Sequence, residues 1–348
     1  MIPESIPTSS GVTSGERAAL PDDPALPGSA LLQQPAQLRD TLSRLLRSWM
    51  GTDAWLQSCT ASLRRYVPGK RCIFELEVTI ARERCVQAEG RRLVGKIFGL
   101  GEGAGLFRTL TELRRHGFAT GSLLVPPPLA YDPDWQLLLL GWAEGELLRS
   151  KLLRRSCAEP QMQEAAAWLL KLHQCGMKDG RRYSFGQHMN ALADQKYWMT
   201  RIWPDGERRL DELMCRIAER SRLLSGWTPG PTHRDFSPDH LMMNGNQLTA
   251  LDFDEFCQYD PLFDVAHFIA HVRFLALTHF DSLTEFDRLA KSFVDAYRAG
   301  AKDFSDARLQ LYLAIAYLKL AHIVAVVQHL PAWRQKVGTI LHEAEQIV

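Results

Sequence analysis

The sequence predicts an α+β fold with a β-rich N-terminal half and a larger helical C-terminal half. Strand-like runs fill the segment from about Ser62 to Leu140. After Leu147, apolar residues recur at helical spacing instead. One hairpin signal, Asn244-Gly245, interrupts the helical half. Strands and helices that are segregated in this way are typical of α+β folds, whereas alternation would indicate a parallel sheet.

The composition narrows the range of functions. The chain has 348 residues, of which 46% are hydrophobic and 23% charged, and its formal net charge is +1. This length suits one or two globular domains. A net charge near zero gives no reason to expect nucleic acid or a membrane surface as partner. The seven cysteines form no CxxC pair, which argues against disulfides or structural zinc and favours reduced thiols in the cytoplasm.

Three segments are expected along the chain. Residues 1–35 are rich in Pro, Ser, Gly, Ala and Thr, which predicts a disordered leader without the features of a signal peptide. Residues 36–145 are expected to form an N-terminal lobe, and residues 146–348 a helical C-terminal lobe. The apolar stretch from Leu309 to Leu330 is expected to be a buried core helix, because polar residues interrupt it more often than in a membrane span. These interruptions are Gln310, Lys319, His322 and Gln328.

Local patterns predict the elements of the N-terminal half. Leucines and a tryptophan at helical spacing predict a first helix over residues 37–50. Partial alternation and β-branched residues predict strands over 71–80 and 92–98. A glycine-rich loop then precedes a predicted helix over 106–116. The continuous apolar run 136–140 predicts a buried strand.

The C-terminal half is predicted to be helical apart from one hairpin. Helical spacing begins after Pro160, a residue suited to the first turn of a helix. Further helices are predicted over 188–224, 262–277, 283–299, 307–329 and 331–347. Apolar runs on both sides of Asn244-Gly245 predict two short antiparallel strands.

Acidic residues at the two ends of this hairpin form the most informative pattern. Asp235 follows His233-Arg234 on a loop before the hairpin, and Asp252 ends it. Because the two ends of a hairpin lie together, both carboxylates are expected at one site. One carboxylate can orient the proton of an attacking hydroxyl, and the other can hold Mg²⁺. Each aspartate taken alone is equally compatible with a turn-capping role.

The segment from His233 to Asp254 resembles the catalytic and metal-binding loops of the aminoglycoside phosphotransferase and choline kinase superfamily. The resemblance extends from about Leu63 to Ile269. It implies a bilobal, protein-kinase-like fold, ATP and Mg²⁺ as cofactors, and Asp235 as catalytic base. It also implies Asp252, with Asp254, as metal ligands.

One position departs from this family pattern. The family has an asparagine five residues after the catalytic aspartate, and this chain has His240 there. Imidazole can bind metals but prefers softer ions than Mg²⁺, which favours oxygen ligands. His240 is therefore a candidate ligand that leaves the number of metal sites open.

A lysine in the N-terminal half supports the same resemblance. Lys96 lies in an apolar strand, where a buried ammonium needs an anionic partner. In kinase-like folds this lysine contacts a helix glutamate and the nucleotide phosphates. Glu112 is the expected glutamate, with Glu102 as the weaker candidate. The structural alternative for Lys96 is a solvent-facing position on its strand.

Two further segments are expected to contact the nucleotide. Lys70 and Arg71 lie in a Pro-Gly turn, where backbone amides or basic side chains can approach phosphate. Gly141 and Ala143 follow the buried strand and resemble the family's interlobe hinge, whose backbone groups would bind adenine. A solvated turn and a plain strand-to-helix connection are the structural alternatives.

The predicted function is ATP-dependent phosphoryl transfer to a hydroxyl of a small molecule, such as an aminoglycoside, a sugar or a choline-like alcohol. Two alternatives stay open. One is a non-catalytic, kinase-like nucleotide-binding module, and the other is a metal-dependent hydrolase built on His233, Asp235, His240 and Asp252. An aminoglycoside would need an acidic pocket for its ammonium groups. The residues placed to form one are Asp239, Asp254, Glu255 and Asp260.

Overall fold

The computed structural model describes residues 22–83, 85, 87–222 and 226–348. The described chain forms two compact units, and the division falls between Glu144 and Gly145, one residue before the predicted lobe boundary. Strands dominate the first unit and helices the second, so the predicted α+β class is confirmed.

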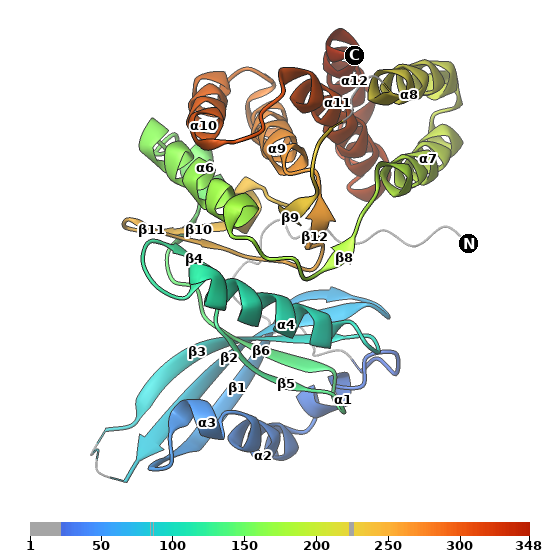
Figure 1. Cartoon of the computed structure of the whole chain (residues 1–348). Helices are drawn as coiled ribbons and strands as arrows, with labels where there is room; N and C mark the ends of the chain where they lie inside the picture. The colour runs from blue at the N-terminus through green and yellow to red at the C-terminus, as the bar shows by residue number, and fades with distance from the viewer. Residues whose placement is uncertain (1–21, 84, 86, 223–225) are drawn as a thin grey trace. The chain divides into compact units, whose positions relative to one another are not determined.

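A five-stranded antiparallel sheet forms the framework of the N-terminal unit (Figure 1). Its strands are β1 (Ala54–Val67), β2 (Arg71–Arg82), β3 (Glu89–Phe98), β6 (Leu137–Gly141) and β5 (Pro128–Asp132), in that order across the sheet. β2, β3 and β6 are the predicted strands. The two edge strands escaped prediction, β1 in its first part and β5 entirely, because most of their residues are half-exposed and lack a clear alternation.

Helices cover both faces of this sheet (Figure 1). On one face lie α2 (Pro35–Leu45) and α3 (Arg47–Met50), where the first helix was predicted. The other face carries α4 (Gly103–Leu113), which the π-helical turn η1 (Arg114–Phe118) extends before the short strand β4 (Leu123–Leu124).

Strand register determines the face on which Lys96 lies. Lys96 is opposite Ile73 of β2 and Leu138 of β6. Its neighbour Ile97 belongs to the apolar core that the sheet forms with the N-terminal helices. Since successive residues of a strand point to opposite faces, Lys96 lies on the face that carries α4.

The predicted leader over 1–35 is wrong for the part that is described. Residues 1–21 lie outside the described residues, but the segment that follows folds into a turn and the short helix α1 (Ser29–Leu32). Leu26 and Leu31 have no exposed surface and belong to the core of the N-terminal unit. A few leucines bury enough apolar area to order a segment whose average composition suggested disorder.

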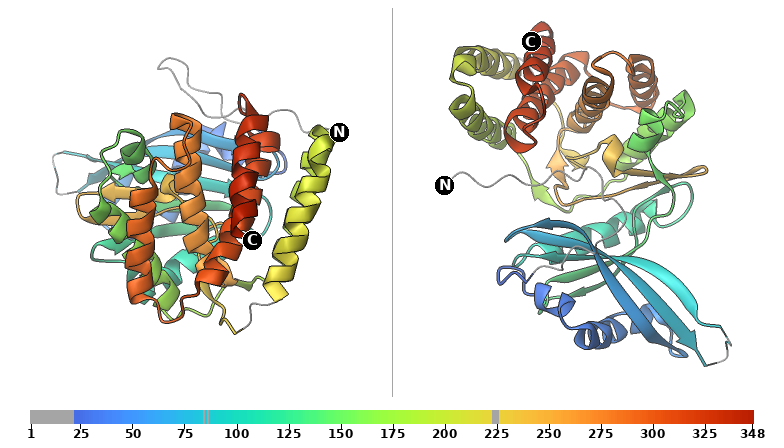
Figure 2. Two further views of the ribbon diagram at one scale, coloured as in Figure 1. Left: turned by 90° about the horizontal axis from the view of Figure 1, so that it is seen from above. Right: turned by 180° about the vertical axis from the view of Figure 1, so that it is seen from behind.

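The C-terminal unit consists mainly of helices, and α11 lies between α9 and α12 (Figure 2). Its α-helices are α5 (Leu148–Leu153), α6 (Glu159–Gln174), α7 (Phe185–Ile202), α8 (Glu207–Arg222), α9 (Leu262–Phe280), α10 (Asp287–Gly300), α11 (Asp306–His322) and α12 (Trp333–Ile347). Short 3₁₀ turns are η2 (Pro204–Gly206) and η3 (Pro238–His240). The predicted helices are present among the described residues; the one over 188–224 is divided at η2, and its last two residues lie outside the described residues.

The stretch Asp306–Val327, formed by α11 and the π-helical turn η4 (Ile323–Val327), is long and apolar enough to cross a membrane by length and composition. Within its most apolar window, 61% of the residues are buried against the rest of the chain. This burial agrees with the core helix predicted over this segment.

Short strands position the loops of the C-terminal unit. The predicted hairpin is present as β10 (Leu241–Asn244) and β11 (Gln247–Ala250), and β7 (Glu146–Leu147) pairs with β10. A second small sheet has the order β8 (Arg181–Arg182), β12 (Cys257–Tyr259), β9 (Gly230–Thr232). These strands of two or three residues are too short for a periodic signal. β9 nevertheless matters, because it ends directly before His233.

Candidate active site

The loop 233–240 is fixed by a buried carboxylate. Asp264, in the first turn of α9, has no exposed surface. Its Oδ2 accepts a hydrogen bond from the backbone N–H of His233 (2.7 Å), and its Oδ1 accepts one from that of Arg234 (2.8 Å). Burial raises the pKa of Asp264, but the hydrogen bond from His173 and the loop amides hold it below its ordinary value. The ionised carboxylate therefore determines the backbone path of the loop.

His233 connects this loop to the end of the hairpin. Its Nε2–H donates to the carbonyl oxygen of Leu251 (2.9 Å), and its Nδ1 accepts from the backbone N–H of Asp235 (3.3 Å). Burial lowers the pKa of His233, so the ring is neutral and carries its proton on Nε2. One buried side chain thus ties Asp235 to the residue directly before Asp252.

Two residues beside the site have a left-handed backbone. Arg234 has φ +69° and Asp252 has φ +61°. Residues with a Cβ adopt this region at a cost of roughly 1–2 kcal/mol each. The guanidinium of Arg234 lies 3.8 Å from the centre of the Tyr183 ring, a cation–π contact that helps to hold its loop. Asp252 turns the chain soon after β11 ends.

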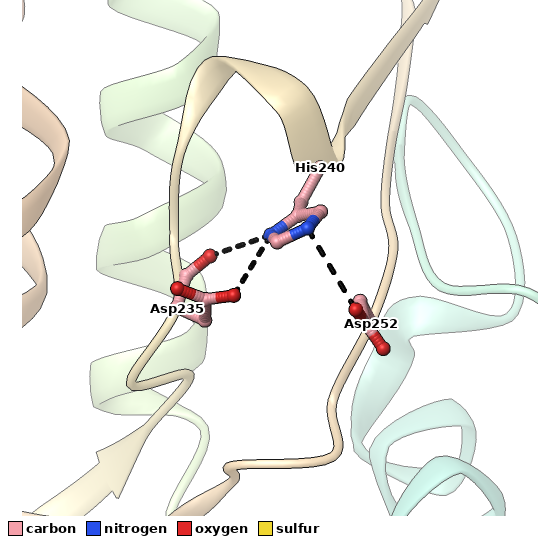
Figure 3. Close-up of side chains that lie close together, drawn as sticks. All are labelled: Asp235, His240 and Asp252. Carbon is pink, nitrogen blue, oxygen red and sulfur yellow. Dashed lines mark hydrogen bonds and ion pairs between the residues drawn. The ribbon is translucent and has the colours of Figure 1, made fainter. Parts of the chain in front are cut away.

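Asp235, His240 and Asp252 lie together, as Figure 3 shows. Nδ1 of His240 is 2.8 Å from the carbonyl oxygen of Asp235 and 3.5 Å from its Oδ2. Nε2 of His240 is 3.7 Å from Oδ2 of Asp252. One ligand atom of each residue lies within 4.8 Å of the others, close enough for a shared metal ion. Asp254, which the sequence also suggested as a ligand, is not in this group.

The other carboxylate oxygen of Asp235 faces two basic side chains. Nε2 of His267 on α9 is 3.1 Å from Oδ1, and Nζ of Lys319 on α11 is 3.8 Å from it. Burial raises the pKa of Asp235, but the hydrogen bond from His267 and the charge of Lys319 hold it well below its ordinary value. Burial lowers the pKa of His267 to about 4, so at neutral pH its neutral ring donates Nε2–H to an ionised carboxylate.

Sequence reasoning missed both of these contacts. His267 and Lys319 are polar residues inside apolar helical runs, where a charge or imidazole needs a partner. The same argument identified Lys96 in its strand. For Lys319 the signal is weaker, because polar residues also interrupt the apolar run of an ordinary core helix.

The expected lysine of the N-terminal unit is buried, but its expected partner is engaged elsewhere. Lys96 is 6% exposed. Glu112 on α4 forms an ion pair with Arg115, three residues along the chain. The nearer arginine at i+3 thus shares the Glu112 carboxylate, and the expected Lys96–Glu112 pair stays a prediction.

The turn between β1 and β2 differs from the expected phosphate loop. The N–H of Gly69 donates to Oδ2 of Asp23 (2.7 Å), and that of Lys70 donates to the carbonyl oxygen of Val67 (3.0 Å). Tyr66 also donates its hydroxyl to Oδ2 of Asp23 (2.9 Å). These amides are already engaged, which leaves the side chains of Lys70 and Arg71 as the candidates for phosphate contacts.

In the segment that resembles the interlobe hinge, Gly141 also makes contacts within its own unit. The N–H of Gly141 donates to the carbonyl oxygen of Pro127 (2.8 Å), and a Cβ at Gly141 would lie 2.4 Å from the Pro127 ring. The glycine is therefore required by close packing. Ala143 follows in the short connection that leads to Gly145, and adenine binding by its backbone stays a prediction.

The expected acidic pocket is not supported. Asp239 forms an ion pair with Arg149 (3.1 Å), and Glu255 forms one with Arg181 (2.6 Å). Asp260 has no exposed surface and pairs with Arg308 (3.2 Å). Arginines that are distant in sequence neutralise three of the four carboxylates, and this pairing was not visible in the sequence.

The chain matches a known protein family over most of its length. The model of the phosphotransferase enzyme family matches residues 79–324, which include the loop 233–240, the hairpin and Lys319. A search among curated proteins found no significant match.

Solved structures with similar folds include small-molecule kinases. A choline kinase from Streptococcus pneumoniae superposes with a TM-score of 0.58 at 11% identity, covering 90% of this chain and 99% of that one. A thermostable mutant of an aminoglycoside phosphotransferase, bound to AMP-PNP and hygromycin B, gives 0.57 at 14% identity, with 88% and 97% covered. A choline/ethanolamine kinase family protein from Mesorhizobium loti gives 0.53 at 16% identity, with 83% and 88% covered. The kinase-like fold predicted from the sequence is thereby confirmed.

Proposed function

Because the chain belongs to the phosphotransferase enzyme family, we propose that it transfers the γ-phosphoryl group of ATP to a hydroxyl group of a small molecule. The observation that carries this proposal is the pairing of an ionised, fixed Asp235 with Asp252 across His240. A carboxylate that faces an acceptor hydroxyl beside a metal-binding carboxylate is the arrangement that phosphoryl transfer needs.

Asp235 has two tasks in this reaction. It accepts a hydrogen bond from the acceptor hydroxyl and so orients the oxygen for in-line attack on phosphorus. The new O–P bond forms as the bond from phosphorus to the ADP oxygen breaks, and the hydroxyl proton passes to Asp235. Because its pKa is held low, Asp235 is a weak base, and orientation is its larger contribution.

The donor groups near Asp235 fit a divalent cation in part. Asp252 supplies a hard oxygen ligand, and Asp254 is proposed as a second one. His240 supplies nitrogen, which suits Mg²⁺ less well. When bound, Mg²⁺ neutralises charge on the phosphates.

Residues of the N-terminal unit are proposed for the nucleotide. Lys96, helped by Lys70 and Arg71, is proposed to contact the phosphates, and the backbone beside Gly141 and Ala143 to contact adenine. Its part is supported by the position of Lys96, which is buried on an apolar sheet where an ammonium is stable only among anionic groups.

The test separates chemistry from binding. Asp235→Asn should lower kcat by about 10²–10⁴-fold while nucleotide affinity changes little, because the carboxylate both orients the acceptor hydroxyl and accepts its proton. Asp252→Ala should instead weaken Mg²⁺-dependent ATP binding. ADP release and calorimetric ATP binding measure the two effects.

A third variant serves as the control for these two. His240→Asn installs the residue of the family motif and should keep or raise activity in Mg²⁺. Full activity of Asp235→Asn would contradict the proposed base. If His240→Asn is as inactive as Asp235→Asn, imidazole takes part in the chemistry and a metal-dependent hydrolase becomes the better assignment.

A further inference from the structure

The two carboxylate oxygens of Asp235 face chemically different surroundings. Oδ2 lies toward His240, which in turn lies 3.7 Å from Asp252. Oδ1 lies toward His267 and Lys319, which come from α9 and α11. Under the proposed function, the metal and the phosphates belong on the side of Asp252. The side of Lys319 is then the side of the acceptor.

Lys319 is placed and equipped to bind an anion there. Its side chain is 29% exposed, so the protein does not enclose it. It lies 3.8 Å from Asp235, which is an ion-pair distance but too long for a hydrogen bond. Within the described residues its ammonium makes no hydrogen bond to the protein. A lysine has three donors, and the ion pair with Asp235 leaves donors for a ligand.

The neighbouring imidazole does not compete for this task. His267 is fully buried and uses its Nε2–H on Asp235, so it holds the carboxylate rather than a ligand. Among the described residues, Lys319 is the only lysine or arginine whose side-chain nitrogen lies within 4 Å of the Asp235 carboxylate.

The carboxylates near the loop 233–240 offer little attraction to a polycationic acceptor, because arginines already pair with them. Arg149 pairs with Asp239, beside the loop, and Arg181 pairs with Glu255, beyond the hairpin. A cationic acceptor would have to displace these arginines and would also meet Lys319, a like charge that costs free energy at short range.

From these contacts we propose that the acceptor is a small hydroxy acid or another alcohol with an anionic group, whose anion binds Lys319 while its hydroxyl binds Asp235. This inference rests on the proposed function and specifies its substrate class. The 3.8 Å between Nζ and Oδ1 means that a short carbon chain between hydroxyl and anion suffices, since each group adds a hydrogen bond of about 2.8 Å. A carboxylate and a phosphate monoester are the two forms that this anion can take.

Matched acceptors test the charge preference. ADP release is measured with 1,3-propanediol and 3-hydroxypropionate, with glycerol, glycerate and glycerol 3-phosphate, and with ethanolamine and choline. The inference predicts that kcat/KM is at least about tenfold higher for an anionic member than for its neutral or cationic counterpart, as one charged hydrogen bond provides. Comparison of glycerate with glycerol 3-phosphate distinguishes the two anions. A wild-type preference for neutral or cationic members, or no preference, overturns the inference.

Variants of Lys319 test the assigned residue. Lys319→Ala should raise KM for the anionic acceptor about tenfold or more and leave KM for ATP unchanged, and Lys319→Glu should remove or invert the charge preference. Lys291→Ala is the matched control, because Lys291 pairs with Asp295 on the surface helix α10. An equal loss of kcat with every acceptor would show that Lys319 acts through Asp235 or on the transferred phosphoryl group, and either result overturns its assignment to the acceptor anion.

A binding measurement keeps the two proposals distinguishable. Calorimetry of 3-hydroxypropionate and glycerol 3-phosphate with wild type and Lys319→Ala needs neither ATP nor turnover. Loss of binding in the variant with no ATP turnover in wild type would refute the proposed function and leave the anion site standing. Turnover of ATP with no Lys319-dependent binding of either anion would refute the anion site alone.

Discussion

The loop 233–240 and the turn 66–71 are each held by an aspartate that accepts backbone N–H groups, but the results differ. In the C-terminal unit, Asp264 accepts from the backbone of the loop, and the Asp235 side chain stays 31% exposed beside Lys319. In the N-terminal unit, Asp23 occupies the amide of Gly69, one of the groups that a phosphate would use. Asp264, on the buried helix α9, thus holds the loop without using the side chain of Asp235. Asp23, from the segment before α1, instead occupies an amide that a phosphate could have used.

Removal of Asp264 should have the largest effect. Asp264→Ala leaves two backbone N–H groups of the loop without their acceptor, and each unsatisfied group costs about 1–3 kcal/mol. We expect a loss of about 2–5 kcal/mol in unfolding free energy and at least a tenfold fall in kcat, measured by denaturant melts and ADP release. Asp264→Asn keeps one acceptor oxygen and should lose less. Unchanged activity of Asp264→Ala would show that the loop does not depend on this carboxylate.

Lys96 tests the cationic contribution of the N-terminal unit. Lys96→Ala should weaken ATP affinity or phosphoryl transfer at least about tenfold, because a charged hydrogen bond contributes about 1.5–3 kcal/mol. Calorimetry with an ATP analogue and initial rates are the measurements. Arg91, which pairs with Glu89 at the start of the same strand, offers the control Arg91→Ala. Wild-type affinity and rate in Lys96→Ala would reject the kinase-like assignment of β3.

The buried His267 predicts an acid-sensitive C-terminal unit. Its folded-state pKa of about 4 lies below the unfolded value near 6.5, so the unfolded chain binds the proton more readily. Stability should therefore fall as pH drops from about 6.5 toward 4, with a contribution of up to about 1.4 kcal/mol per pH unit. His267→Gln should reduce this slope in unfolding measurements. An identical slope in both proteins would place the proton uptake at other groups.

Removal of Asp23 should have the smallest effect on stability, and it should maintain or raise ATP affinity instead of lowering it. Asp23→Ala deletes three accepted hydrogen bonds in the N-terminal unit, from Tyr66, Gly69 and Ala25, and should cost about 1–3 kcal/mol in unfolding free energy. Because it also frees the Gly69 amide, ATP affinity should stay the same or rise. Asp22→Ala is the control, since Asp22 lies one residue earlier and is exposed. A fall in ATP affinity without loss of stability would contradict this account.

The same contrast explains what the sequence could predict. Asp235 and Asp252 were found because a hairpin signal lies between them, and Lys96 because a charge stood in an apolar strand. For contacts made by packing of distant helices, a polar residue in an apolar run signals that a partner is needed, but the sequence does not show which residue that partner is. Lys319 approaches Asp235 only because α11 packs against α9. Likewise, Glu112 has two possible basic partners in the sequence, Lys96 and Arg115. Only the structure shows that Arg115 pairs with it.

The composition of residues 1–35 gave a wrong prediction of disorder for a related reason. An average over residues 1–35 reports low hydrophobicity, but Leu26 and Leu31 pack completely against the sheet. Disorder depends on whether the available apolar area offsets the entropy of ordering, and here a few side chains provide enough. The edge strand β1 was underestimated because half-exposed positions carry little periodicity.

The left-handed backbone of Arg234 and Asp252 has an evolutionary consequence. Glycine adopts this conformation without the Cβ penalty, so Gly at either position would relieve strain of about 1 kcal/mol while deleting the side chain. For Asp252 that side chain is the proposed metal ligand. Under the proposed function, Gly at position 252 would therefore give a more stable protein without its metal ligand, so stability and activity make opposite demands on this residue.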